Sequence, residues 1–544
     1  MASEATGVER GVQPRLFARK ASGLVREFGF FDSFVFNVIG YALGLVLAIT
    51  PFFGGALFPD ANMFLILTFG VVLSLFNGLT YGLLGGAMPR SGGDYVYNGR
   101  VLHPAIGFMA NWGFTWSQFL GIGIYTQWTI NYALAVSAAT IGYSTGSQGL
   151  IDFSTFISRP GPSFVFSLIV LAIVVLVQLG GMRFLRRFLN LFFFIAVIGT
   201  LVTLFVFLSA TRDQFVSAFN QFMSANADLE NAYSAVLSQA REAGFTQPAT
   251  TVGGALLALP LGYWVFIGFT YSAYIGGEVK EPQKVQSRAI LASLFFGYLL
   301  YMVVLAAYYN TVGTEFNNAA AHLEYNDASP LPVAGVLNFF AGLLTSNVVL
   351  NVLMGLSFFL WHFLLLFVMF TICVRNMFAW SFDQIMPTWL TRVTSTTRAP
   401  WSATLAVALI SAILLWASIF TPLFDYIFNY IAIFSIAFWI TSFAAILLPY
   451  RKRELFESSP PNIQARIGGV PLVTIAGVVN LILFTVILYS SFTLPAFSGP
   501  VGPASLTFLF GIYLVGLAIY YVAAGVRRRE GTDFNLLFTE IPPE

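Results

Sequence analysis

Long apolar stretches alternate with short polar segments along the whole chain. Most stretches are runs of Leu, Phe, Val and Ile, and many are long enough to cross a hydrocarbon core of ~30 Å, which needs roughly 20 residues per helix. The pattern predicts an all-α polytopic membrane protein with about twelve transmembrane helices. We place them at residues 33–57, 62–87, 104–138, 164–182, 188–210, 253–276, 288–312, 346–373, 401–421, 424–449, 469–492 and 504–526.

Lys and Arg residues are distributed unevenly among the gaps between these stretches. The chain has 26 of them, and all except Arg159, Arg212 and Arg241 lie in the N-terminal arm, in the tail or in every second gap. Positive charge beside a span resists translocation, so Lys and Arg stay in cytoplasmic loops. The distribution predicts an even number of spans in the cell membrane, with both termini in the cytoplasm.

Composition narrows the class of protein further. Hydrophobic residues make up 57% of the chain and charged residues 9%, whereas soluble domains typically carry about 25% charged residues. The single Cys373 excludes a disulfide within one chain and a thiolate metal cage. His103, His322 and His362 are too scattered for paired haem ligation. We expect no cofactor, no metal site and no nucleic-acid partner, and the spans contain no catalytic cluster typical of an enzyme.

Glycines interrupt two of the predicted spans. Gly40 and Gly44 flank Tyr41-Ala42-Leu43 in the first, and the sixth contains Gly262, Gly268, Gly276 and Gly277. Gly-interrupted helices in corresponding positions of two halves indicate inverted repeats whose unwound centres face a binding site at the membrane midplane. The alternative interpretation is that these glycines only permit close helix packing.

Three motifs lie in the predicted cytoplasmic gaps. They are PRSGGDYVYNGR at 89–100, GGEVKEPQKVQSRAI at 276–290 and RNMFAWSFDQIMP at 375–387. In order and spacing they resemble motifs of the amino acid permeases in the amino acid-polyamine-organocation (APC) superfamily. The resemblance extends over roughly residues 28–450.

This resemblance implies a LeuT-like core of two inverted five-helix repeats (5+5) with discontinuous helices 1 and 6. The core would occupy residues 33–449, after a cytoplasmic arm at 1–32. The outside segment 211–252 contains an amphipathic helical pattern and is expected to cap the core. Two peripheral helices at 450–526 and a cytoplasmic tail at 527–544 would follow.

The resemblance also implies where a substrate binds, at the unwound centres of helices 1 and 6. The matching positions are Gly40, Tyr41, Ala42, Gly44, Trp264, Phe266, Gly268 and Thr270. Trp264 or Phe266 would form an aromatic gate. Ala42 and Gly44 depart from the family pattern, which has glycine and phenylalanine there, and Ala makes a left-handed backbone costlier. Further candidates for the pocket are Asn111, Trp116, Gln118 and His362.

Four charged residues are candidates for a cytoplasmic gate: Arg26, Glu278, Arg375 and Asp383. In the family's fold the loop of Asp383 faces the base of helix 1, so an ion pair between Arg26 and Asp383 is one hypothesis. Arg375 and Arg392 are competing partners for Asp383.

The sequence gives little support for sodium coupling. Sodium-coupled relatives have hydroxyl side chains near the positions of Val368 and Met369, and lysine-stabilised relatives have a lysine near Ala196 and Val197. His362 is a candidate proton site because histidine titrates near neutral pH. A hydrogen-bonded packing role is the alternative for His362.

The function predicted from this resemblance is secondary-active amino acid transport by alternating access. A neutral or apolar amino acid is favoured, because the sequence shows no obvious buried carboxylate to balance a cationic side chain. The alternatives are a permease-like sensor that binds an amino acid without transport, and a transporter of polyamines or other organic cations. The lipid bilayer is the only partner that the sequence indicates besides the substrate, and the pattern leaves the oligomeric state open.

Overall fold

The computed structural model describes residues 26–424, 430–493, 502–530 and 538. Most of the predicted N-terminal arm, the start of the predicted span at 424–449 and most of the predicted tail lie outside the described residues. The described chain is helical almost throughout. Its two β-strands, β1 (Arg466–Ile467) and β2 (Val470–Pro471), form one short hairpin.

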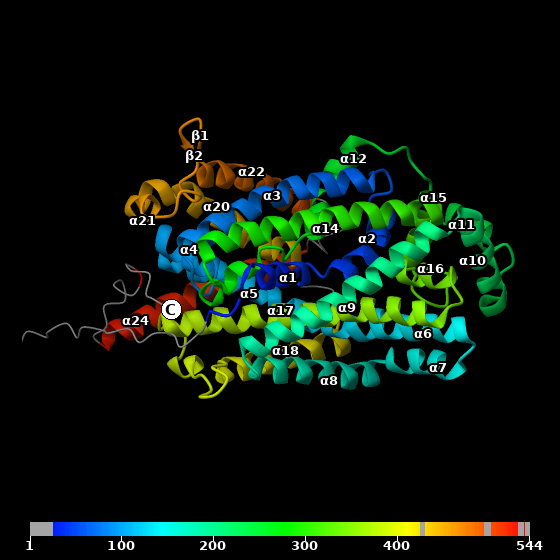
Figure 1. Ribbon diagram of the computed structural model, residues 1–544, viewed down its shortest axis with the longest axis horizontal. Coiled ribbons are helices and arrows are strands. Elements are labelled where there is room, and N and C mark those ends of the chain that lie inside the picture. Colours follow the sequence, from blue (N-terminus) through cyan, green and yellow to red (C-terminus); the bar gives the residue numbers. More distant parts are fainter. Residues whose placement is uncertain (1–25, 425–429, 494–501, 531–537, 539–544) are drawn as a thin grey trace, which may run out of the picture.

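Ten segments of the described chain are helices long and apolar enough to cross a membrane, and Figure 1 shows most of them running along the long axis of the molecule. Two of the predicted twelve spans are not among the ten. The ten comprise α1 and α2 together (Phe30–Leu57), α3 (Met63–Ala87), α8 (Pro160–Leu179), α9 (Met182–Ser209), α14 (Pro282–Val312), α17 (Val348–Phe382), α18 (Trp401–Phe420), α20 (Tyr430–Arg451), α22 (Leu472–Thr493) and α24 (Pro503–Arg529).

One of the two remaining predicted spans is a long helix of lower hydropathy. It consists of α5 (Pro104–Trp128), a π-helical turn η1 (Thr129–Leu134) and α6 (Ala135–Thr145). Asn111, Thr115, Ser117 and Gln118 are fully buried along α5. Polar side chains are tolerated at these positions because α5 packs among α17, α18, α20 and α24 and so does not expose them to lipid.

The other remaining predicted span, at 253–276, is not a continuous helix. It is divided into α12 (Val252–Leu257), α13 (Leu259–Trp264) and two 3₁₀ turns, η2 (Tyr271–Tyr274) and η3 (Gly276–Glu278). The chain between Trp264 and Tyr271 has no regular helix. The glycines noted in the sequence therefore mark a real interruption.

Shorter helices cluster at the two ends of the bundle (Figure 1). One end carries α10 (Arg212–Ala227), α11 (Ala232–Glu242), α15 (Thr314–Tyr325) and α16 (Leu337–Leu343). The opposite end carries α4 (Asp94–Val101) and α21 (Arg453–Glu457), and the chain is completed by α7 (Gln148–Ile157) and η4 (Thr388–Thr391).

The predicted amphipathic helix in the segment 211–252 is α11. Ala232, Val236 and Ala240 form its buried face, packed on α15. In the neighbouring α10, Phe215 and Phe219 contact the ring of Phe316 on α15. These aromatic contacts fix α10 and α11 at the end of the bundle.

Outward-facing side chains of the long helices suit a lipid environment. On α8 and α9, Leu176, Phe205 and Leu208 have more than three-fifths of their surface exposed. Contiguous exposed apolar surface of this kind marks a membrane interface rather than a water-facing surface. The fold is that of a multi-pass membrane protein.

Glycines let α3 and α13 meet backbone to backbone. A Cβ placed at Gly70 on α3 would overlap the carbonyl oxygen of Gly262, and a Cβ at Gly262 would lie 2.5 Å from the carbonyl oxygen of Ile66. Small residues at such crossings allow the close approach that holds membrane helices together. This contact fixes the first half of the interrupted helix against α3.

We expect Gly70→Val to destabilise the protein, because the neighbouring backbone cannot move aside as a side chain can. Overpacking typically costs about 1–3 kcal/mol. The matched control is Gly511→Val in α24, where a Cβ meets nothing within 4 Å. Thermal unfolding of both variants in detergent measures the effect, and an equal Tm for the two would contradict the packing account.

Candidate functional site

The first long helix is interrupted at Tyr41 and Ala42. α1 (Phe30–Gly40) ends before them, and α2 (Leu43–Leu57) begins after them. Ala42 has a φ of 48°, in the left-handed region that non-glycine residues rarely adopt. The expected discontinuity of this helix is therefore present, even though the family's glycine is replaced by alanine.

The second interruption touches the first. Gly268, with a φ of 111°, turns the chain between Trp264 and Tyr271. A Cβ at Gly40 would lie 2.6 Å from the carbonyl oxygen of Gly268, and a Cβ at Gly268 would overlap the carbonyl of Gly40. Only glycine permits so close an approach of the two backbones.

Side chains from neighbouring helices satisfy the exposed backbone groups of the second interruption. The Ser272 N–H donates to Asn37 Oδ1 at 2.8 Å, and Gln286 Nε2 donates to the Ser272 carbonyl at 3.0 Å. The Tyr301 hydroxyl donates to the Val265 carbonyl at 3.2 Å. Irregular backbone at membrane depth persists only where protein or a cavity satisfies it. These three side chains therefore make the interruption possible.

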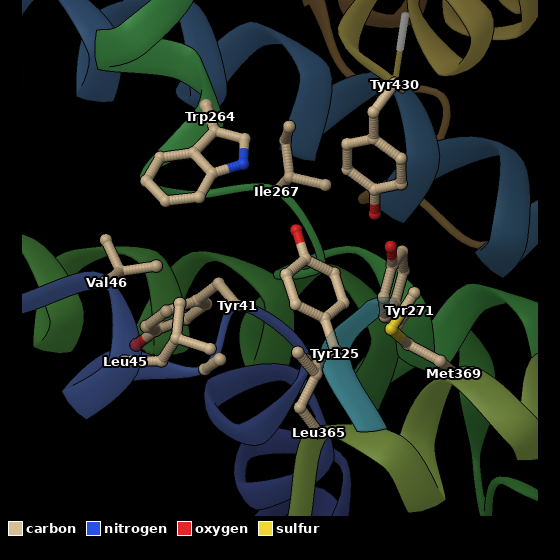
Figure 2. Close-up of a pocket in the computed structure, with 12 residues that line it drawn as sticks. Tyr41, Leu45, Val46, Tyr125, Trp264, Ile267, Tyr271, Leu365, Met369 and Tyr430 are labelled. Carbon is tan, nitrogen blue, oxygen red and sulfur yellow. The ribbon is translucent and has the colours of Figure 1, made fainter. Parts of the chain in front are cut away.

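A small cavity lies between the two interruptions (Figure 2). Its volume is about 20 Å³, enough for a water molecule and too small for an amino acid. In Figure 2 the hydroxyls of Tyr271 and Tyr430 point toward one another, and the Tyr271 hydroxyl donates to Gln118 Oε1 at 2.9 Å. The residues lining the cavity are Gly40, Tyr41, Ala42, Leu45, Val46, Tyr125, Trp264, Ile267, Tyr271, Leu365, Met369 and Tyr430.

Half of the predicted substrate-binding residues line this cavity. Gly40, Tyr41, Ala42 and Trp264 do, whereas the other four lie outside its lining. Gly268 touches Gly40, which lines the cavity. Gly44, Phe266 and Thr270 each lie in a different environment.

Gly44 packs against another helix, since a Cβ there would overlap the ring of Trp361. Phe266 is buried, and its ring lies 5.6 Å from that of Tyr301. Thr270 is also buried, with 1% of its surface exposed. Of the two aromatic residues considered for a gate, only Trp264 reaches the cavity.

Sequence reasoning missed most of the wall. Leu365 and Met369 lie four residues apart on α17 and so share one face, a spacing that gives a weak signal once the cavity is known. Tyr125 comes from α5 and Tyr430 from the start of α20. No local motif marks these two tyrosines in a chain with 23 Tyr and 58 Phe.

The additional pocket candidates lie outside the cavity lining; Asn111, Gln118 and His362 are buried, and Trp116 is partly buried. Gln118 contacts a lining residue, because its Oε1 accepts a hydrogen bond from the Tyr271 hydroxyl. Asn111 donates to Asp94 at 2.6 Å, and the ring of Trp116 lies beside those of Trp112 and Phe119.

His362 is enclosed within α17. Its Nδ1 lies 2.9 Å from the Phe358 carbonyl, the geometry of a hydrogen bond to the preceding helical turn. Its ring packs edge-on against the ring of Phe358. A packing role explains these contacts, and a proton-binding role for His362 stays a prediction.

Two buried ion pairs lie near the end of the molecule that carries α4. Arg375 binds Glu278 through two bonds, of 2.7 and 2.9 Å, and both side chains are at most 3% exposed. Arg100 on α4 binds Asp383 at 2.7 Å, and the Tyr95 hydroxyl donates to the same carboxylate oxygen at 2.7 Å. Paired, hydrogen-bonded charges of this kind hold the segments that carry them together.

The hypothesis that Arg26 forms an ion pair with Asp383 is wrong. Asp383 pairs with Arg100, and Arg26 is exposed. Arg100 competes better because α4 presents its guanidinium inside the protein, beside Tyr95. Arg375 does not compete for Asp383, because Glu278 binds it.

The chain just before α1 nevertheless lies against the end of the second interruption. The backbone N–H groups of Glu27 and Phe28 donate to the Glu278 carbonyl at 2.9 and 3.0 Å. The Lys280 N–H donates in turn to the Phe28 carbonyl at 2.8 Å. The Arg183 guanidinium lowers the pKa of the Glu27 carboxyl by a direct hydrogen bond. The bases of the two interrupted helices are thus joined at one end of the molecule.

The chain is similar to known proteins over most of its length. A family model described as amino acid permease matches residues 28–519. The branched-chain amino acid permease BcaP of Bacillus subtilis is 24% identical over 397 residues, which cover 72% of this chain and 74% of that protein. An uncharacterized transporter of Mycobacterium tuberculosis is 24% identical over 404 residues, with the same two coverages. The glutamate/serine transporter AimA of Bacillus subtilis is 22% identical over 47% of this chain and 43% of its own.

We expect Glu278→Gln to lower the Tm of the purified protein markedly. Removing one partner of a buried ion pair leaves the other charge uncompensated and typically costs about 3–5 kcal/mol. The control is Glu281→Gln, which breaks the exposed pair with Lys284 and should leave the Tm unchanged. Thermal unfolding of both variants tests this, and an unchanged Tm in Glu278→Gln would contradict the importance of the buried pair.

Proposed function

The chain belongs to the amino acid permease family, and from this membership we propose a secondary-active permease that works by alternating access. Family and relatives make it a transporter and not an enzyme. The amino acid would bind at the two helix interruptions. The observation that carries this proposal is the small cavity between Tyr41-Ala42 and the segment from Trp264 to Tyr271.

The interruptions offer partners for both charged groups of an amino acid. The first N–H groups of α2, from Leu43 on, have no preceding helical turn to bond with, and Ala42 provides no side-chain cap. The N-terminus of a helix carries partial positive charge and suits a carboxylate. The carbonyls at the C-terminal ends of α1 and α13 suit an ammonium group in the same way.

The walls of the cavity favour a neutral, apolar side chain. Leu45, Val46, Ile267, Leu365 and Met369 supply aliphatic surface, and none of the described residues that line the cavity carries a charge. A charged substrate side chain would be desolvated here without a counter-ion. One relative is named as a branched-chain amino acid permease, which supports the same preference.

We assign the end of the molecule with α4 to the cytoplasm, following the distribution of Lys and Arg. The buried pairs of Glu278 with Arg375 and of Asp383 with Arg100 then close the cytoplasmic path. The helices α10 and α11 lie at the opposite end and would cover the outer entrance (Figure 1).

Uptake into proteoliposomes tests the function. We expect labelled leucine, isoleucine and valine to exchange against internal unlabelled amino acid, and arginine and glutamate to exchange poorly. Saturable binding of leucine without any flux would instead indicate a sensor. Flux of polyamines without amino acid flux would indicate an organic cation transporter.

We expect Leu365→Ala to change the substrate preference by enlarging the aliphatic wall. Adding or removing a methylene contact in an apolar pocket changes the preference between two substrates by about 10–200-fold. The exchange rate of phenylalanine should therefore rise relative to that of valine. Leu366→Ala is the matched control, because Leu366 is equally buried but lies outside the lining. The ratio of phenylalanine to valine exchange is measured for both, and an unchanged ratio in Leu365→Ala would remove α17 from the substrate site.

A further inference from the structure

Asp94 is a fully buried carboxylate whose described partners are all neutral. It is the first residue of α4, within the motif at 89–100. Asn111 Nδ2 donates to its Oδ1 at 2.6 Å, and the hydroxyls of Tyr81 and Tyr274 donate to its Oδ2 at 3.2 and 3.1 Å. No described Lys, Arg or His forms an ion pair with it.

This environment differs from those of the other buried carboxylates at the same end of the molecule. Glu278 and Asp383 each bind an arginine. Asp94 has only dipoles to balance its charge, and burial raises its pKa to about 6. Protonation of Asp94 therefore falls in the physiological range, unlike that of an ordinary carboxyl.

The groups that interact with Asp94 within the described chain are neutral and come from five elements. Tyr81 comes from α3 and Asn111 from α5. Three tyrosine hydroxyls interact electrostatically with the carboxylate: those of Tyr274 on η2, Tyr97 on α4 itself and Tyr513 on α24. Arg100, also on α4, is bound to Asp383, and Arg90 in the preceding loop lies over the ring of Phe382.

The loop before Asp94 holds the unwound segment of the second interruption. The Gly92 N–H donates to the Tyr274 carbonyl at 2.9 Å, and Ser91 forms an isolated β-bridge with Ile275. A Cβ at Gly93 would lie 2.7 Å from the Tyr274 ring. The Asp94 carboxylate thus completes a set of contacts that clamp Tyr274 to α4.

Tyr274 connects this clamp to the cavity. Its ring stacks on Phe114, with centroids 4.5 Å apart, and lies 6.2 Å from the ring of Tyr271. Tyr271 lines the cavity. A change at Asp94 can therefore reach the cavity through the contact between the rings of Tyr274 and Tyr271.

The hydroxyl of Tyr81 has a second acceptor available. It lies 3.4 Å from Thr441 Oγ1 on α20, as well as 3.2 Å from Asp94. When a proton binds Asp94 Oδ2, that oxygen becomes a donor and Tyr81 can donate to Thr441 instead. The Tyr81 hydroxyl thus has an acceptor within reach in either protonation state of Asp94.

We propose that Asp94 is the proton-binding site that couples amino acid transport to the proton gradient. This inference rests on the proposed function. A proton from outside adds to Asp94 Oδ2, and the charge-assisted bond that restrains Tyr274 weakens. The unwound segment is then free to move and the cytoplasmic path opens. The O–H bond breaks again when the proton leaves to the cytoplasm, and the clamp reforms.

The test compares wild-type protein with Asp94→Asn in proteoliposomes. Asn has the shape of the protonated acid but cannot release a proton. Two assays are run: leucine accumulation driven by an inward proton gradient of one pH unit, and leucine exchange without a gradient. Coupling to one proton supports up to about tenfold accumulation. We expect wild type to accumulate leucine, and Asp94→Asn to exchange it without accumulation.

The control is Asp152→Asn, an exposed residue of α7 bonded to Gln148, which should match wild type in both assays. Accumulation by Asp94→Asn equal to that of wild type would overturn the proposal. Exchange by wild type with no response to the proton gradient would also overturn it, and would leave the proposed function intact. Failure of wild type to exchange any amino acid would overturn the proposed function instead.

A second measurement tests the proposal even if the Asp94→Asn protein does not exchange leucine. Difference infrared spectroscopy of purified protein, titrated between neutral and acidic pH, detects protonated carboxyl groups. We expect a carboxyl band with a midpoint near pH 6 in wild type, following the raised pKa of Asp94, and its loss in Asp94→Asn. Persistence of that band in Asp94→Asn would overturn the assignment.

Discussion

The structure depends on one constraint, that backbone N–H and C=O groups inside a membrane must find partners within the protein. Two helices of the described chain are interrupted, and they can exist only where other parts of the protein form hydrogen bonds to their free backbone groups. Gly40 and Gly268 bring the two interruptions into backbone contact. Asn37, Gln286 and Tyr301 supply hydrogen bonds to the second one. The same enclosure that satisfies the backbone creates the cavity.

Charge is placed at one end of the molecule in two different ways. Glu278 and Asp383 are neutralised by arginines and act as fixed links between segments. Asp94 lies at the same end, its partners within the described chain are neutral, and we propose that it binds a proton. A transporter needs both kinds of group, because a path that opens and closes requires firm contacts and at least one contact whose strength changes.

Much of this arrangement can be predicted from the sequence, because its cause is local. Hydropathy locates the long helices, and glycines locate both interruptions. Glu278 and Arg375 both lie in motifs that the sequence singles out, and they form one buried ion pair; their role as a gate stays a prediction. The partner of Asp383 could not be predicted, because Arg100 lies 283 positions away in the chain and only the fold brings the two together. The pairing of buried charges is a property of the tertiary structure.

The cavity wall was also beyond prediction from sequence. Tyr125, Tyr430 and Leu365 come from three separate helices, and nothing in their own segments distinguishes them from tyrosines and leucines that pack or face lipid. The long helix containing α5 illustrates the same limit. Its apolar character predicts a span, yet its buried polar residues show that it is surrounded by protein.

The central claim, that an amino acid binds between the two interruptions, is tested most directly by protection of a single engineered cysteine. Cys373, the one native cysteine, is buried and is not among the residues that line the cavity, whereas a cysteine in place of Ala42 would line it. The account predicts that leucine slows modification of Ala42→Cys in proportion to its occupancy, while arginine does not. Full modification at a leucine concentration that saturates exchange would contradict it.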